Sequence, residues 1–180
     1  MIVLFTNCTT KTVQLRSVTV ADFSNFVAAT DYKTDAEQYD WTFIQQTVDH
    51  FEVVFGVDWR CPDGISPAHP DDPITQVSYN DAKAYTEWSS TQLPDYQKYW
   101  ETVKTDKRKI NSHASTILPT EQVNIVGNTW DITLPDSQGR IRLAGGSYLC
   151  NALQCNGTKR ERVLYVDQET GNSHISFSVY

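Results

Sequence analysis

The sequence has little that would let it bind nucleic acid or enter a membrane. Of its 180 residues 15 are basic and 22 acidic, which gives a net charge of −7 and a pI of about 5.0. A general nucleic-acid partner needs a basic face, so this class of protein is disfavoured. The apolar start at residues 1–6 is too short for a secretion signal or a membrane span and indicates an edge strand. We expect a cytoplasmic protein with no nucleic-acid or membrane partner.

Histidine and cysteine are also scarce, with four residues of each type. No two histidines have the HxxxH or HExxH spacing, so a histidine site for iron or zinc is not indicated. A histidine on the surface or in a cleft is the default interpretation of each. The four histidines are His50, His69, His113 and His174.

Three helices are predicted by their caps and apolar spacing. Thr19 can cap the first, the segment 78–81 forms a capping box for the second, and Asp95 can cap a third after Leu93. The inward-facing side chains would be Phe23, Phe26, Val27, Ala82, Tyr85, Trp88, Tyr96, Tyr99, Trp100 and Val103.

The last third of the chain carries turn signals and short β-rich segments at 129–134, 140–143, 162–166 and 174–179. Helices followed by short strands indicate an α+β fold. The length suits one domain with a substantial core, which we expect to span residues 1–180.

Two thiols, Cys150 and Cys155, lie five residues apart after a Gly-Gly-Ser turn. On a strand they would face opposite sides, and on a helix they would be well off one face. An irregular loop is therefore needed to bring them together. Two converging thiolates suit a soft ion such as Cu(I), whereas a structural disulfide or two thiols without a function remain alternatives.

Six segments, in order, resemble the formylglycine-generating enzymes. They are 20–37, 59–64, 72–88, 93–101, 123–131 and 145–150 with Cys155. The last contains Gly-Gly-Ser-Tyr-Leu-Cys and is similar to the family's "GGSYMC" motif with its second cysteine. The resemblance implies an irregular, C-type-lectin-like α+β fold.

The resemblance also implies a copper-dependent oxidase. In the family the matching cysteines hold Cu(I), and O2 then oxidises a substrate thiol. The resemblance thus implies that Cys150 and Cys155 bind copper and that Ser147 orients the thiol or oxygen. The alternative interpretation of Ser147 is a serine that only closes the turn. The substrate would be a thiol-containing peptide or a small cysteine-derived compound.

The segment 123–131 is similar to a calcium loop of the family. Calcium prefers carboxylate, amide and carbonyl oxygens. Asn124 and Asp131 would provide side-chain oxygens, and Gly127 and Thr129 backbone carbonyls. The loop would support the thiol pair, although a plain turn before a strand is the alternative.

Several positions depart from the family. Thr86 and Val179 replace a disulfide of secreted members, as expected in a reducing compartment. Val163 stands where an arginine is usual in the family, which argues against a sulfatase-type Cys-x-Pro-x-Arg peptide as the substrate. His174 stands where asparagine is frequent. The divergent stretch 156–172 keeps open a non-catalytic alternative, a lectin-like ligand-binding protein of the retroelement-diversified kind. The sequence leaves the oligomeric state open.

Overall fold

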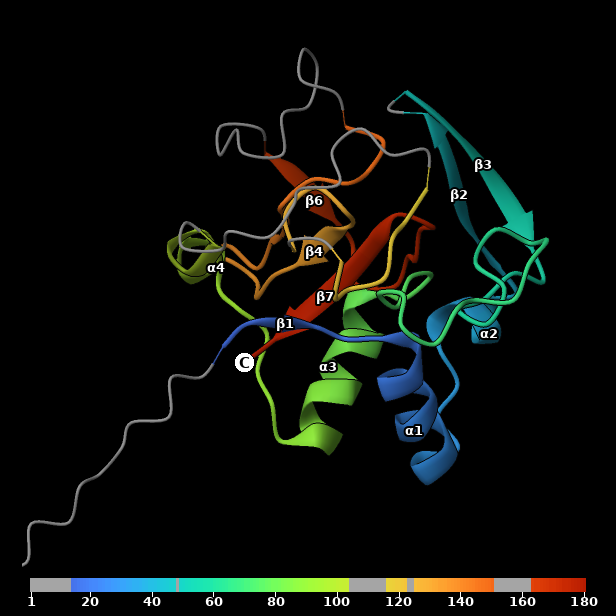
Figure 1. Ribbon diagram of the computed structural model, residues 1–180, viewed down its shortest axis with the longest axis horizontal. Coiled ribbons are helices and arrows are strands. Elements are labelled where there is room, and N and C mark those ends of the chain that lie inside the picture. Colours follow the sequence, from blue (N-terminus) through green and yellow to red (C-terminus); the bar gives the residue numbers. More distant parts are fainter. Residues whose placement is uncertain (1–13, 48, 104–115, 123–124, 151–162) are drawn as a thin grey trace, which may run out of the picture.

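The protein has the expected mixed α+β architecture around a five-stranded sheet (Figure 1). The computed structural model describes residues 14–47, 49–103, 116–122, 125–150 and 163–180. The strand order is β1-β7-β4-β5-β6, in which β4 and β7 run parallel and the other neighbours antiparallel. The strands are β1 (Arg16–Ser17), β4 (Trp130–Ile132), β5 (Ile141–Ala144), β6 (Leu164–Val166) and β7 (Ile175–Val179).

Each of the four strand segments predicted in the last third coincides with one strand, and only β5 runs a residue beyond its predicted end, so those predictions are confirmed. The strand predicted at residues 1–6 lies outside the described residues. In the part of the chain that is described, no helix combines the length and apolar character that a membrane span requires.

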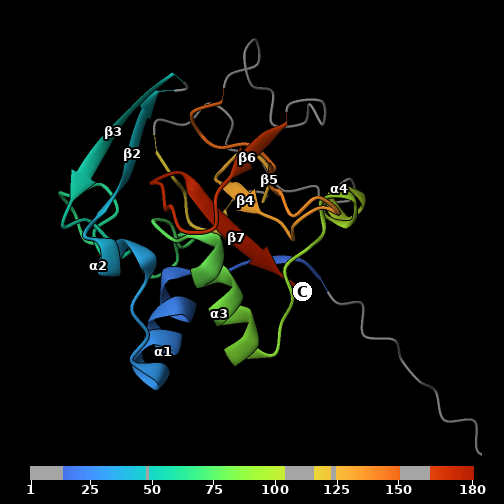
Figure 2. The ribbon, with the colours of Figure 1, turned by 180° about the vertical axis from the view of Figure 1, so that it is seen from behind.

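All three predicted helices form: α1 (Val20–Thr30), α3 (Tyr79–Ser89) and α4 (Tyr96–Val103). Thr19 and Ser78 each close a capping box with an aspartate three residues on, and Asp95 accepts a hydrogen bond from the Lys98 amide. In both views α1 and α3 lie together on one side of the sheet, whereas α4 lies at its other end (Figures 1 and 2).

Aromatic side chains join these helices to the sheet. The ring of Phe23 stacks on Tyr85 with centroids 6.0 Å apart, and Tyr85 meets Phe177 of β7 edge-on at 5.4 Å. Trp88 was expected to face inward, but it is 43% exposed and only its inner side touches Phe26 and Tyr85. The short helix α3 ends at Ser89, so Trp88 lies at the rim of the core.

A β-hairpin and a short helix precede α3 and were not predicted. Helix α2 (Asp35–Tyr39) begins with a capping box between Thr34 and Glu37, a signal that is visible in the sequence. The hairpin pairs β2 (Trp41–Thr47) with β3 (His50–Phe55), and a bridge from Phe43 to Asn172 ties β2 to the body. Strand β3 is the outermost element on that side in both views (Figures 1 and 2).

Candidate functional site

The Gly-Gly-Ser turn follows directly on β5. Gly145 and Gly146 have φ values of 92° and 88°, in the left-handed region that glycine occupies without a steric penalty. The turn therefore depends on both glycines, and it carries the chain inward to Ser147, which is fully buried.

Ser147 and Cys150 form a tight turn. The Cys150 amide donates to the Ser147 carbonyl at 2.9 Å, and the Ser147 amide donates to the Cys150 sulfur at 3.4 Å. Cys150 is only 2% exposed and is disulfide-bonded, and the cysteine that completes the bond lies outside the described residues. Cys155 is outside them too, so the convergence of the predicted thiol pair stays a prediction.

His174, which precedes β7, lies beside Ser147. Its Nδ1 is 3.4 Å from the Ser147 hydroxyl oxygen, and the tautomer decides which of the two donates. Burial lowers the pKa of His174 to about 4, so the imidazole is neutral near pH 7. The sequence predicts only a surface or cleft histidine at this position. The one sequence signal of a functional role for His174 is its position, at which the family often has asparagine.

A cavity of about 360 Å³ opens in front of Ser147 and His174. Gln45 and Phe51 of the hairpin line it on one side. Apolar residues of the sheet, including Trp130 and Leu143, line the other. This volume is at the lower end of the range for small-molecule sites, roughly 300–1,000 Å³. The cavity can therefore admit a side chain or a small ligand to the serine–histidine pair.

The loop predicted to bind calcium is attached to the Gly-Gly-Ser turn. The Gly127 amide donates to the Gly146 carbonyl at 3.1 Å, and the Tyr148 amide donates to the Asn128 carbonyl at 2.9 Å. The Asn128 side chain in turn binds both backbone groups of Leu118. The loop thus supports the turn through hydrogen bonds of its own.

Asp131, the carboxylate proposed for calcium, lies in β4 within the core. Its two oxygens accept hydrogen bonds from the hydroxyls of Tyr99 (3.0 Å) and Ser178 (2.7 Å). Burial raises the pKa of Asp131 to about 7. Within the described ranges there is no group of three or more His, Cys, Asp or Glu residues that could hold a metal ion. Asn124 lies outside those ranges, and the calcium assignment, with Gly127 and Thr129, stays a prediction.

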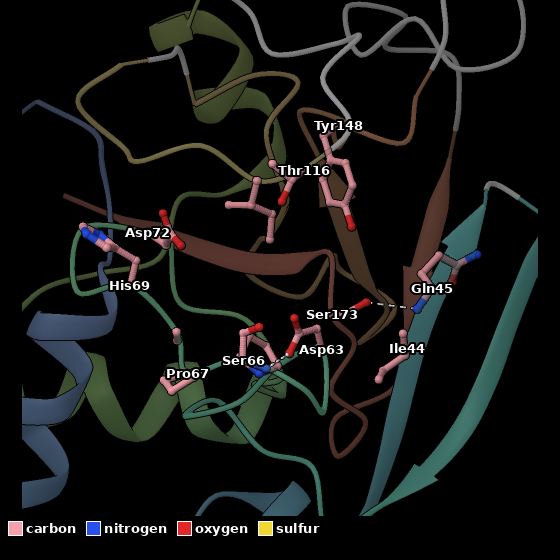
Figure 3. Close-up of a pocket in the computed structure, with 13 residues that line it drawn as sticks. Ile44, Gln45, Asp63, Ser66, Pro67, His69, Asp72, Thr116, Tyr148 and Ser173 are labelled. Carbon is pink, nitrogen blue, oxygen red and sulfur yellow. Dashed lines mark hydrogen bonds between the residues drawn. The ribbon is translucent and has the colours of Figure 1, made fainter.

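A second cavity, of about 260 Å³, shares Gln45 with the first. Tyr148 and Ser173, the chain neighbours of Ser147 and His174, line this second space (Figure 3). Asp63 also lines it, and the amides of residues 65 and 66 lower the pKa of that carboxyl although burial opposes them. The two short segments 147–148 and 173–174 thus contribute residues to both cavities.

Together, an irregular α+β fold and a Gly-Gly-Ser turn beside a buried cysteine define a lectin-like protein of the formylglycine-generating type. The family described as sulfatase-modifying factor enzyme 1-like domain (FGE-sulfatase) matches residues 12–103. The chain therefore belongs to this family, as the sequence motifs indicated.

Individual relatives agree with this assignment. Over 103 residues the chain is 32% identical to a formylglycine-generating enzyme of Thermomonospora curvata and 35% identical to one of Bos taurus. These matches cover 47% of this chain but 34% and 27% of the two relatives. An inactive Cα-formylglycine-generating enzyme 2 of Bos taurus is 30% identical over 103 residues, 47% of this chain and 33% of that protein. The chain thus spans about a third or less of these relatives.

Solved structures confirm the fold. The structure of PvdO from Pseudomonas aeruginosa superimposes with a TM-score of 0.61 at 14% identity, over 91% of this chain and 77% of that one. CarF superimposes with a TM-score of 0.52 at 13% identity, over 91% of this chain and 83% of that one. The predicted C-type-lectin-like α+β fold is therefore correct. The family match ends before the Gly-Gly-Ser turn, so it supports the fold rather than the site.

Proposed function

We propose that the protein is a copper-dependent oxidase of the formylglycine-generating type, which uses O2 to oxidise a thiol. The thiol would belong to a peptidyl cysteine or to a small cysteine-derived compound. The observation that carries the proposal is the position of Ser147, which contacts both the Cys150 sulfur and His174 at one end of a cavity. Ser147 and Cys150 lie in the segment 145–150, which resembles the family motif.

The residues suit copper better than a harder ion. Cys150 and Cys155, once reduced, would hold Cu(I), since thiolates are the ligands that Cu(I) prefers. The Cys150 sulfur is buried, so a metal ion held by it would be shielded from bulk water. Bound copper would supply the O2-reactive centre.

The chain's own groups would bind and orient the substrate. The Ser147 hydroxyl can direct a hydrogen bond toward a thiol or an oxygen species at the cavity end. In the tautomer that carries the proton on Nδ1, neutral His174 would donate a hydrogen bond to the Ser147 oxygen, which leaves the hydroxyl proton for the substrate and places no positive charge there. Trp130 and Leu143 make part of the wall apolar, which limits water around the reacting atoms.

A non-catalytic ligand-binding protein is the second candidate. Two observations favour it: Cys150 is disulfide-bonded, and one relative at 30% identity carries the name of an inactive enzyme. In that case the cavity would bind its ligand without chemistry, and the cysteine bond would only fix the turn.

An anaerobic Cu(I) competition titration of the reduced protein tests the proposal. We expect one tightly bound ion per chain, lost in Cys150→Ser and in Cys155→Ser. The matched control is Cys61→Ser, because Cys61 is a free, partly exposed thiol away from the turn and should not contribute. Ser147→Ala should bind copper normally but consume O2 with a thiol substrate about 100-fold more slowly. Binding that survives in both cysteine variants would refute the site and favour the second candidate.

A further inference from the structure

The outer strand of the hairpin, β3, carries an exposed apolar row. Phe51, Val53 and Phe55 are 55%, 52% and 73% exposed, and they alternate along the strand. Alternating residues share one face of a strand, so the three side chains form a continuous row. Phe43 of β2 packs against the row, with its ring centroid 5.0 Å from that of Phe51.

The backbone edge of β3 is open at the same residues. Phe43 directs its carbonyl away from β3, toward the Ser173 amide and the Gln76 side chain. The opposed pair Phe43–Val53 is therefore of the non-hydrogen-bonded kind, and Val53 presents its N–H and C=O outward. Residues two apart in a strand direct their N–H and C=O groups to the same edge, so Phe51 and Phe55 also present theirs outward. Among the described residues no strand pairs with this edge.

The row is symmetric about Val53. The segment Phe51-Glu-Val-Val-Phe55 places phenylalanine two residues to either side of a central valine. An antiparallel copy rotated about Val53 would oppose Val53 to Val53 and Phe51 to Phe55. The outward N–H and C=O groups of all three residues would then meet partners, since opposed residues of this kind exchange both hydrogen bonds.

We propose that β3 is the interface of a two-fold symmetric homodimer, in which two hairpins join into one four-stranded antiparallel sheet. A second copy fits better than an unrelated strand because both the side chains and the backbone groups of this edge are self-complementary. Exposed edges are usually protected by lysine, proline or a covering segment. Strand β3 contains neither residue, and its one acidic side chain, Glu52, lies 3.6 Å from His50.

The contact area sets the strength of the dimer. The exposed parts of the three side chains come to roughly 300 Å² a copy, if a phenylalanine contributes about 200 Å². Two copies would bury at most about 600 Å² of these side chains in addition to the paired backbone, which is in the range of weak interfaces, below about 1,200 Å². The dimer should consequently depend on concentration. It would place Phe55 of the second copy beside Phe51, which also lines the first cavity.

Sedimentation of the purified chain from low-micromolar to near-millimolar concentration provides the first test. We expect a reversible monomer–dimer equilibrium that Val53→Lys weakens at least about tenfold, or ~1.4 kcal/mol. The matched control is Glu52→Lys, which adds the same ammonium group one residue away on the other face and should change the equilibrium less than about twofold. Circular dichroism checks that both variants fold. A monomer at every concentration, or equal weakening by both variants, would overturn the proposal.

Cross-linking tests the register independently of affinity. Opposed residues of the hydrogen-bonded kind have Cα atoms about 5.5 Å apart, within the range of a disulfide. Under mild oxidation Val53→Cys should give a covalent dimer. Glu52→Cys should not give a covalent dimer, because its two thiols would lie out of register. The parent, with its Cys61, should not give one either. A covalent dimer of equal yield in the parent or in Glu52→Cys would contradict pairing about Val53.

Discussion

Gly145 links the turn to the core through one close approach. A Cβ added at Gly145 would meet the Tyr99 hydroxyl, which cannot easily move because it donates to Asp131. The positive φ of 92° adds strain for any other residue. The Gly-Gly-Ser turn and the buried Asp131 carboxylate are therefore linked through Tyr99.

We expect Gly145→Ala to destabilise the protein by about 3 kcal/mol, from backbone strain together with the displaced tyrosine. Gly139→Ala is the matched control, because Gly139 also has a positive φ, 77°, but no atom lies within 4 Å of its added Cβ. Its cost should stay near 1 kcal/mol. Urea denaturation of both variants measures the difference, and equal losses would show that the close approach does not matter.

Contiguous motif residues were predictable, whereas their distant partner was not. Ser147 and Cys150 lie within one short segment, and their contact follows from a local turn. His174 is 27 residues from Ser147, and nothing local to it indicates that the two meet. Its role beside the serine depends on the pairing of β7 with β4, which only the folded chain establishes.

At the scale of elements, Asp81 joins two helices. It closes the capping box of α3, and its Oδ1 accepts hydrogen bonds from the Asp35 amide of α2 and the Tyr32 hydroxyl. Burial, with the nearby Asp35 charge, raises the pKa of Asp81 from 3.8 to about 6, although its hydrogen bonds oppose the shift. The junction thus holds a carboxyl group that is costly to ionise.

This junction predicts a pH dependence of stability. Between about pH 4 and pH 6 the folded protein keeps a proton on Asp81 that the unfolded chain releases. The free energy of unfolding should therefore fall as the pH rises through this window, by on the order of 3 kcal/mol, and this contribution should be constant above it. Denaturant titrations across this range should show a smaller decline in Asp81→Asn. A variant with the slope of the parent would contradict the assignment.

The hairpin of β2 and β3 was not predicted, because its formation depends on tertiary contacts more than on an apolar pattern. Strands β2 and β3 contain the alternating aromatic and β-branched residues of a hairpin, but most of β3 is exposed. Apolar patterning predicts strands that face a core, whereas these pack mainly on each other and on Asn172 and Ser173. The capped helices were predictable because each cap lies within a few residues of its helix.

Across the whole molecule, Phe23 connects most of the core. Its ring contacts Phe26 within α1, Tyr85 of α3, Trp59 of a loop and Phe177 of β7, and it is fully buried. Both helices and the sheet thus lose packing if this single side chain is shortened.

Phe23→Ala should cost about 3–5 kcal/mol of the free energy of unfolding, through lost burial and the cavity left behind. Ile65→Ala serves as the control, because Ile65 is 86% exposed and its truncation should change stability by less than about 0.5 kcal/mol. Thermal and urea unfolding give both values. A loss at Phe23 no larger than that at Ile65 would mean that the aromatic cluster does not hold the helices to the sheet.

The sequence by itself determined the capped helices, the strands of the last third, the α+β class and the family, because short-range patterns and contiguous motifs encode all of these. It also predicted Ser147 and Cys150 as site residues, but left copper, calcium and the thiol substrate as predictions. Only the tertiary structure decided that His174 meets Ser147, that Asp131 is held by two hydroxyls, and that no strand of the described residues pairs with the outer edge of β3. The reason is that these features depend on which distant segments pack together, and packing is a property of the whole fold.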